Sequence, residues 1–313
     1  MSIAGPTGPA GPAGIQGEKG KSGRMGLDGP TGPAGSSGGG IINGTNVIAA
    51  TGTFTNVGTE RNTIFGVNVT ATGTSVVAIG YGSIAGGTSS VAIGNSSSAT
   101  GTSAIAIGNN SKANSNSSVA YGPSSLAGGN NSVSIGNSSS ATGAQAIAIG
   151  NNSKANGFNS VAYGPSSLAI GESSVSIGYF SSATGTQAIA IGNNSNANGN
   201  NSVAYGPVSL AIGESSVAIG NSSSATGTSA IAIGSNSKAN GNNSVAIGLD
   251  SVSNTDDQIV LGSSASTVVP GGLLILSNKS SSDPTGILGM IYFNTTTNTF
   301  RCFDGAWKTM NLT

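Results

Sequence analysis

A short apolar run followed by glycine recurs every fourteen residues through the middle of the chain. These glycines stand in register from Gly66 to Gly262, and most follow an apolar triplet such as Val91-Ala92-Ile93. A fixed period with a short strand in each repeat is typical of a solenoid, in which each unit buries its apolar side only against its neighbours. We therefore predict an all-β solenoid of 14-residue rungs over residues 66–262.

Counting from Val91 gives a fourteen-position frame that holds along this region. Position 1 is Val or Ile, position 2 is usually Ala, position 3 is Ile or Tyr, and position 4 is Gly. Positions 7 and 9 are Ser and Ala in nearly every rung, and position 11 is usually Gly. Period-two alternation bounded by Gly, Asn and Ser predicts two short strands per rung, near positions 14 to 3 and 7 to 10, joined by tight turns.

The first strand of each rung has two unlike sides. Val and Ile at positions 1 and 3 point one way, and Ala at position 2 points the other way. We place Val and Ile inside the coil, against the small residues at positions 7 and 9. Ala at position 2 would then face a neighbouring chain, which suits a three-fold contact. The inverse orientation remains an alternative.

We assign the recurrent Gly, Ser and Ala at positions 4, 7 and 9 a role in the fold and not in a binding or catalytic site. Glycine permits backbone dihedrals that a Cβ forbids, and a serine hydroxyl at position 7 can bond a turn N–H or C=O in every rung. The residues assigned to this class include Gly94, Gly108, Gly136, Ser97, Ser111, Ala99 and Ala113. A repeated serine nucleophile is the alternative, and the absence of histidine from the chain argues against it.

A second period overlies the first, because residues 109–150, 151–192 and 193–234 are near copies, each three rungs long. One rung of each copy carries Tyr at position 3, Pro at position 5 and Leu at position 8. The favoured interpretation is packing, in which the larger side chains fill a thicker layer of the coil. The alternative is a ladder of contacts for a glycan or receptor. The candidate contact residues are Tyr121, Tyr163, Tyr205, Leu126, Leu168 and Leu210, with Trp307 near the C-terminus.

The segments on either side of the solenoid have patterns of their own. Glycine at every third position from Gly5 to Gly38 predicts a collagen-like stalk over residues 1–40, with a flexible linker as the alternative. Residues 41–65 are a transition expected to cap the first rung. Residues 263–282 form a neck. Residues 283–313 predict a small β meander at the tip, with strands at 290–294 and 299–303 and a third beginning at Ala306.

Composition excludes several classes of function. Charged residues are only 6%, acidic and basic residues are equal in number, and histidine is absent. Such a chain has no electrostatic field that would attract nucleic acid or an anionic membrane. No apolar run is long enough to suggest membrane insertion. The lone Cys302 allows no intrachain disulfide. With no metal set, cofactor motif or catalytic constellation, we expect no cofactor and no enzymatic activity; a β-helical polysaccharide-acting enzyme is a remote alternative.

Several rungs carry a resemblance to a known family. Asn131–Gly136 and Ser216–Ser223, with the following Ala225 and Gly227, resemble the head repeats of trimeric autotransporter adhesins across residues 66–262. The resemblance implies a left-handed parallel β-roll, three chains packed side by side, and a head that binds host matrix proteins or other surfaces. The family's signal peptide and C-terminal membrane anchor are not evident. Residues 256–273 and the string around Trp307 also resemble segments of phage and large-virus structural proteins.

These patterns together predict a homotrimeric attachment fibre. We expect a fibre on the surface of a virus or phage that binds a host cell-surface glycan or protein multivalently. The alternative is the head of a bacterial trimeric surface adhesin at the cell surface. In either case the expected partners are further copies of the chain and a host surface molecule.

Overall fold

The structure is a computed structural model that describes residues 41–43, 46–51, 55–56, 61–263, 291–294, 297 and 299–310. All regular elements among these residues are β-strands, so the all-β prediction is confirmed for them. The predicted collagen-like stalk, residues 1–40, lies outside the described residues, and so does all of the predicted neck except Ser263.

The described solenoid is built from two long sheets, sheet A with 17 strands and sheet B with 15, and all their strands pair in parallel except β1. The strands of sheet A are β1 (Ile41–Asn43), β2 (Asn46–Thr51), β4 (Thr63–Val67), β6 (Val77–Ile79), β8 (Val91–Ile93), β10 (Ile105–Ile107), β12 (Val119–Tyr121), β14 (Val133–Ile135), β16 (Ile147–Ile149), β18 (Val161–Tyr163), β20 (Val175–Ile177), β22 (Ile189–Ile191), β24 (Val203–Tyr205), β26 (Val217–Ile219), β28 (Ile231–Ile233), β30 (Val245–Ile247) and β32 (Ile259–Leu261). The strands of sheet B are β3 (Thr55–Asn56), β5 (Thr70–Ala71), β7 (Ile84–Ala85), β9 (Ser98–Ala99), β11 (Lys112–Ala113), β13 (Leu126–Ala127), β15 (Ser140–Ala141), β17 (Lys154–Ala155), β19 (Leu168–Ala169), β21 (Ser182–Ala183), β23 (Asn196–Ala197), β25 (Leu210–Ala211), β27 (Ser224–Ala225), β29 (Lys238–Ala239) and β31 (Val252–Ser253).

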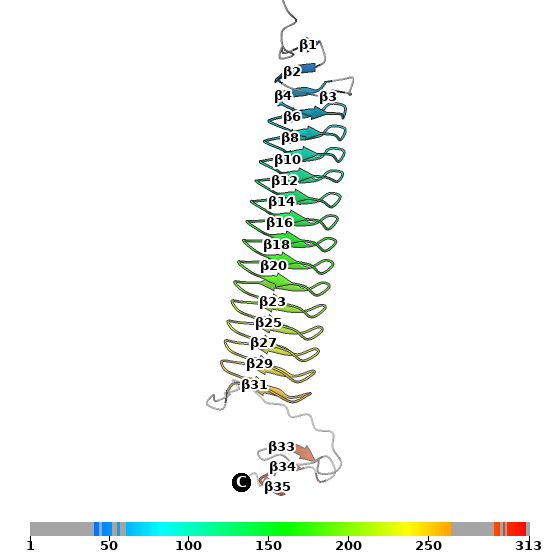
Figure 1. The fold of residues 1–313 in the computed structure, drawn as a ribbon. Coiled ribbons are helices and arrows are strands. Elements are labelled where there is room, and N and C mark those ends of the chain that lie inside the picture. Colours follow the sequence, from blue (N-terminus) through cyan, green and yellow to red (C-terminus); the bar gives the residue numbers. More distant parts are fainter. Residues whose placement is uncertain are drawn as a thin grey trace, which may run out of the picture.

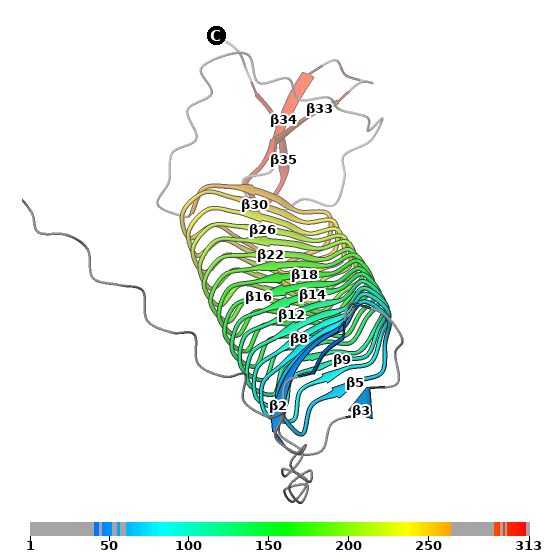
Figure 2. The same ribbon diagram turned by 90° about the horizontal axis from the view of Figure 1, so that it is seen from above.

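Each rung contributes one strand to each sheet, and successive rungs stack in a constant register (Figure 1). Ile105 of β10 lies opposite Val91 of β8, and Lys112 of β11 lies opposite Ser98 of β9. The same fourteen-residue offset joins each neighbouring pair of strands from β4 to β32, so the predicted period is confirmed. Viewed from above, the rungs follow one another as similar loops (Figure 2).

The predicted orientation of the first strand was wrong. Ala92 is fully buried in the coil, whereas Val91 and Ile93 on either side of it are only half-buried and point outward. The inward positions are therefore 2, 7, 9, 11 and 14, which carry mostly Ala, Ser and Gly. Two strands of two or three residues enclose a thin interior, and side chains of one or two heavy atoms fill it. Val or Ile at position 2 would hold the sheets apart.

The rung that begins with β4 has larger inward side chains than those that follow. Its inward positions carry Ile64, Val69 and Val76, each 1% exposed or less, in place of the usual Ala and Ser. On the N-terminal side, β2 pairs in parallel with β4, and β1 adds an antiparallel strand to β2. This strand reversal lies in the segment for which the sequence predicts a cap.

Two tight turns close every rung, at frame positions 4 to 7 and 11 to 14. The residue at position 6 or 13 has a left-handed backbone every seven residues, as in Ser96 (φ 52°) and Ser103 (φ 55°). Gly94 at position 4 has φ 133°, and a Cβ there would lie 2.5 Å from the Gly108 carbonyl oxygen of the next rung. The Ser97 hydroxyl donates to the Gly94 carbonyl at 3.2 Å, which is the turn bond expected from the sequence.

The C-terminal strands form a separate three-stranded antiparallel sheet. β33 (Ile291–Asn294) pairs with β34 (Thr299–Phe303), and β34 pairs with β35 (Trp307–Thr309). These are the strands that the sequence predicts for the meander, with a turn at Asp304-Gly305. The part of the chain that the structure describes contains no candidate membrane-spanning helix.

Candidate interaction surfaces

The outer face of sheet A, formed by frame positions 1 and 3 and called here the apolar face, is hydrophobic along its whole length. From Val77 to Leu261, these two columns contain only Val, Ile, Leu and Tyr. Position 1 is half-buried in most rungs, and many position 3 side chains are exposed, such as Ile135 and Ile219 at 36%. At about 4.8 Å per rung, the face is on the order of 60 Å long. A monomeric soluble protein rarely exposes an apolar patch of this extent.

The candidate tyrosines lie on the apolar face, not inside the coil. Tyr121, Tyr163 and Tyr205 occupy position 3 and are each 55% exposed. Tyr121 lies between Ile107 and Ile135 in the register of sheet A. The interpretation that these rings fill a thicker layer of the interior was therefore wrong, because the thin interior admits no such side chain.

The candidate leucines lie on the opposite side of the coil, so they form no common site with the tyrosines. Leu126, Leu168 and Leu210 occupy position 8, where they are half-buried on the outer face of sheet B. They do not fill the interior either, since Ala127, Ala169 and Ala211 are the inward residues of the same strands.

The outer face of sheet B also carries the positive charge of the coil. Lys112, Lys154 and Lys238 are exposed at position 8, and they are the only Lys or Arg residues between 62 and 263. Asn196 takes the equivalent place in the third copy of the repeat. The acidic residues of the same range lie in the turns, so the two signs of charge occupy different surfaces.

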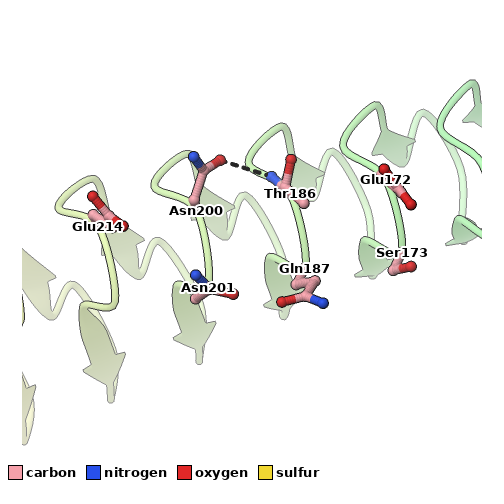
Figure 3. A pocket seen from close by; sticks show the side chains of 7 residues that line it. All are labelled: Glu172, Ser173, Thr186, Gln187, Asn200, Asn201 and Glu214. Atoms are coloured by element: carbon pink, nitrogen blue, oxygen red, sulfur yellow. Dashed lines mark hydrogen bonds between the residues drawn. The ribbon is translucent and has the colours of Figure 1, made fainter.

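A shallow hollow of about 390 Å³ lies along the turns at frame positions 12 and 13 (Figure 3). Glu172 and Glu214 stand at its two ends, three rungs apart, with amide and hydroxyl side chains between them. The Thr186 backbone N–H donates to Asn200 Oδ1 at 2.9 Å. Three rungs are about 14 Å, which is too far for two carboxylates to share a proton or an ion. The described residues contain no group of His, Cys, Asp or Glu able to hold a metal.

The turns at frame positions 5 and 6 contain aromatic residues that the sequence analysis missed. Tyr179 and Phe180 are 50% and 49% exposed, and their rings meet edge to face with centroids 4.4 Å apart. The signal that could have found them is a break in the three-rung repeat. The other two copies have Asn137-Ser138 and Asn221-Ser222 at the same place.

Trp307 lies on the C-terminal sheet, where it is half-buried opposite Phe303. Its carbonyl accepts a hydrogen bond from Arg301 Nη2 at 2.9 Å. Nearby, Lys308 Nζ lies 2.6 Å from Asp304 Oδ2. This hydrogen bond lowers the pKa of Asp304 and raises the pKa of Lys308 from their ordinary values. These contacts connect β34, β35 and the turn between them.

One comparison with known proteins, the match to a family model, identifies the repeat of the coil. The family model described as the YadA head domain repeat matches residues 67–98, 99–125, 127–153, 155–181, 183–209, 211–237 and 225–251. Among solved structures, the collagen-binding domain of the Yersinia adhesin YadA is 27% identical, with a match that covers 58% of this chain and 76% of that one and a TM-score of 0.24. A search of curated protein sequences finds no match.

Proposed function

Since this chain belongs to the family of YadA head domain repeats, we propose that it forms the head of a homotrimeric adhesin displayed on the surface of a bacterial cell. The observation that carries the proposal is the apolar face of sheet A. Its columns run without a charged residue from Val77 to Leu261, and a single chain would leave them in water.

Three copies of the chain can cover this face by packing their apolar columns against one another. The columns at positions 1 and 3 keep one register along the coil, so three parallel chains can bring their apolar faces together around a common axis. Each rung then meets the same rung of its neighbours, and Tyr121, Tyr163 and Tyr205 form three levels of aromatic contact. We also propose the left-handed sense of coiling that the family resemblance implies.

Binding, and not turnover, is the activity that this surface supports. The inward side chains are Ala and Ser in nearly all rungs, and the chain contains no histidine to activate a serine. Glu172 and Glu214, the two acidic residues that line the hollow at positions 12 and 13, are three rungs apart. A trimer would instead present three copies of each outer surface to a host molecule, which multiplies weak contacts into a strong attachment.

A fibre on a virus or phage is the second candidate. The Gly-X-Y triplets from Gly5 to Gly38 and the C-terminal string around Trp307 favour it. The comparisons fit the bacterial adhesin at least as well, and the family match lies wholly within the coil. Immunogold labelling of the source cells and of their particles separates the two candidates, because the label decorates either the cell envelope or the virion.

Binding of the purified full chain to host cells tests the adhesin function. We expect the trimer to bind cells at least roughly a hundredfold more tightly than a variant whose apolar face carries Ile147→Asp and Ile189→Asp, because a single chain loses the multivalent gain. The control variant is Lys154→Gln, which lies on the outer face of sheet B and should leave the trimer intact. Absence of cell binding by the wild-type trimer, or equal binding by the separated chains, would refute the proposal.

A further inference from the structure

Five exposed apolar residues occur at the turns of three rungs within a run of four consecutive rungs. Tyr179, Phe180 and Val208 are 50%, 49% and 53% exposed, and Pro165 and Pro207 are exposed beside them. All five occupy frame positions 5 or 6, on one edge of the coil between the two sheets. We call this group the aromatic edge.

Backbone hydrogen bonds between rungs align these turns. The Phe180 N–H donates to the Pro165 carbonyl at 3.1 Å, and the Val208 N–H donates to the Asn193 carbonyl at 2.8 Å. In the rung between them, the N–H of Asn194 donates to the carbonyl of Tyr179 at 2.9 Å. The side chains at positions 5 and 6 therefore follow two short parallel columns. Four rungs span about 14 Å along the coil.

The backbone conformation at Phe180 and Val208 is unfavourable for residues of these types. Phe180 has φ 53° and Val208 has φ 57°, which is the left-handed region. A bulky or β-branched residue is unfavourable there, whereas Asn and Asp are tolerated. Position 6 is Ser or Asn in the neighbouring rungs, as at Ser166, Asn194 and Ser222. Strain of this kind, retained at an exposed site, points to a role outside folding.

The aromatic edge also departs from the internal repeat. Where this copy has Tyr179-Phe180, the others have Asn137-Ser138 and Asn221-Ser222. The fold therefore does not require aromatic rings at this turn, since the same turn forms with Asn and Ser in the other copies. The rings are an addition to one region of the coil.

We propose that the aromatic edge binds a neutral oligosaccharide. The rings of Tyr179 and Phe180 offer faces on which sugar rings stack, and the amides of Asn193 and Asn194, in the rung between the aromatic pair and Val208, offer hydrogen bonds to sugar hydroxyls. Asn194 Nδ2 donates to Asn193 Oδ1 at 2.6 Å, which holds the two amides in a fixed arrangement. This inference deepens the proposed adhesin function, on which it rests, by naming the class of ligand.

The shape and charge of the aromatic edge favour a sugar chain over a protein or an acidic polymer. No Asp, Glu, Lys or Arg occurs among residues 161–171 or 173–213, so the edge offers no ionic contact. Its two columns of turn residues extend only about 14 Å along the coil, which is short for the roughly 800 Å² that each partner contributes to a stable protein–protein interface. A neutral sugar chain needs no ionic contact and is thin enough to bind along these columns.

Binding of the full chain to an array of neutral and charged oligosaccharides tests the inference. The informative variant is Tyr179→Asn with Phe180→Ser, which restores the residues of the other two copies. We expect the wild type to bind neutral oligosaccharides on the array, and the variant to bind them at least roughly tenfold more weakly, a loss of about 1.4 kcal/mol. The control is Tyr81→Asn, which removes a similarly exposed ring from position 5 far from the edge; its affinity should stay within about twofold.

Three outcomes would overturn the inference. They are no binding of neutral oligosaccharides by the wild type, unchanged affinity in the double variant, and a change of oligomeric mass in that variant, which would show that the rings serve contacts between chains. If the wild type attaches to cells but does not bind neutral sugars, the inference fails and the adhesin function stands. If the wild type fails to attach to cells, the adhesin function fails first.

Discussion

Inside the coil, Ser134 Oγ lies 2.7 Å from Ser139 Oγ, and both side chains are fully buried. Ser139 also donates its only hydroxyl hydrogen to the Gly136 carbonyl at 3.0 Å, so Ser134 is the donor to Ser139. The same pair recurs as Ser176 and Ser181. Where serine replaces alanine at position 2, the hydroxyl at position 7 of the same rung serves as its acceptor.

This relationship predicts unequal effects for two similar substitutions. Ser139→Ala removes the partner of both Ser134 and the Gly136 carbonyl, and should reduce the free energy of unfolding by about 1–3 kcal/mol. Ser134→Ala restores the residue that most rungs have at position 2, and should cost less than about 1 kcal/mol. Guanidinium denaturation of both variants measures the difference. Equal losses would contradict the assigned direction of the hydrogen bond.

The close approach of successive rungs predicts that alanine will greatly lower the free energy of unfolding at one glycine and will not lower it at another. A Cβ on Gly143 would lie 2.0 Å from the Gly157 carbonyl oxygen, whereas a Cβ on Gly128 would meet nothing closer than 3.6 Å. Neither residue has a positive φ. Gly143→Ala should therefore lower the free energy of unfolding by about 3 kcal/mol or more, because the backbones of the two neighbouring rungs must move apart.

Gly128→Ala is the matched control, and its expected effect ranges from neutral to a gain of up to about 1 kcal/mol, because alanine restricts the unfolded chain. Thermal unfolding followed by circular dichroism compares the two variants. If Gly143→Ala unfolds at the wild-type temperature, the rungs are not stacked as closely as described here.

Buried serines at position 14 are of two kinds, and they should respond oppositely to alanine. The Ser160 hydroxyl donates to the Gly157 carbonyl at 2.7 Å, whereas Ser132 Oγ is buried without a hydrogen-bond partner. Ser160→Ala should cost about 1 kcal/mol, and Ser132→Ala should be neutral or stabilising because it removes an unsatisfied polar group. Ala146 occupies the same position in a neighbouring rung, so alanine fits. Chemical denaturation measures both variants. A greater loss of free energy of unfolding for Ser132→Ala than for Ser160→Ala would contradict the hydrogen bonding assigned to these two serines.

The sequence predicts the architecture of the coil well because the pattern repeats. Each glycine and each small residue occurs at the same frame position many times, so the period, the strands and the hydrogen bond of Ser97 could be inferred without coordinates. The direction in which Val91 and Ala92 point could not. Alternation says only that neighbours face opposite ways, and the interior size that selects alanine depends on how closely two sheets approach.

The candidate sites were less predictable than the fold. Tyr121 and Leu126 belong to the same rung but lie on opposite outer faces, because one is at position 3 of the first strand and the other at position 8 of the second. A repeat pattern also carries no information about residues that occur in only one copy. Tyr179 and Phe180 are visible only as an exception to the repeat, and their exposure and backbone strain appear only in the structure.

Relief of backbone strain predicts a stabilising substitution at the aromatic edge. Val208 has φ 57° and is β-branched, while Ser166 at the same place in the preceding copy has φ 55°. Val208→Ser should raise the free energy of unfolding by about 1 kcal/mol, because a β-branched side chain is disfavoured in the left-handed region. Ser166→Val is the reciprocal control and should lower it by a similar amount. An unchanged or lower unfolding temperature for Val208→Ser would argue against strain at this turn.

The oligomeric mass of the full chain in solution tests the central claim most directly, because the adhesin function proposed here requires three chains to cover the apolar faces. Sedimentation equilibrium should give a mass of about three times the 29.9 kDa of one chain, and Ile147→Asp with Ile189→Asp should shift it toward that of a single chain, because buried carboxylates oppose the contact. A wild-type mass equal to one chain, with the apolar face in water, would contradict the account.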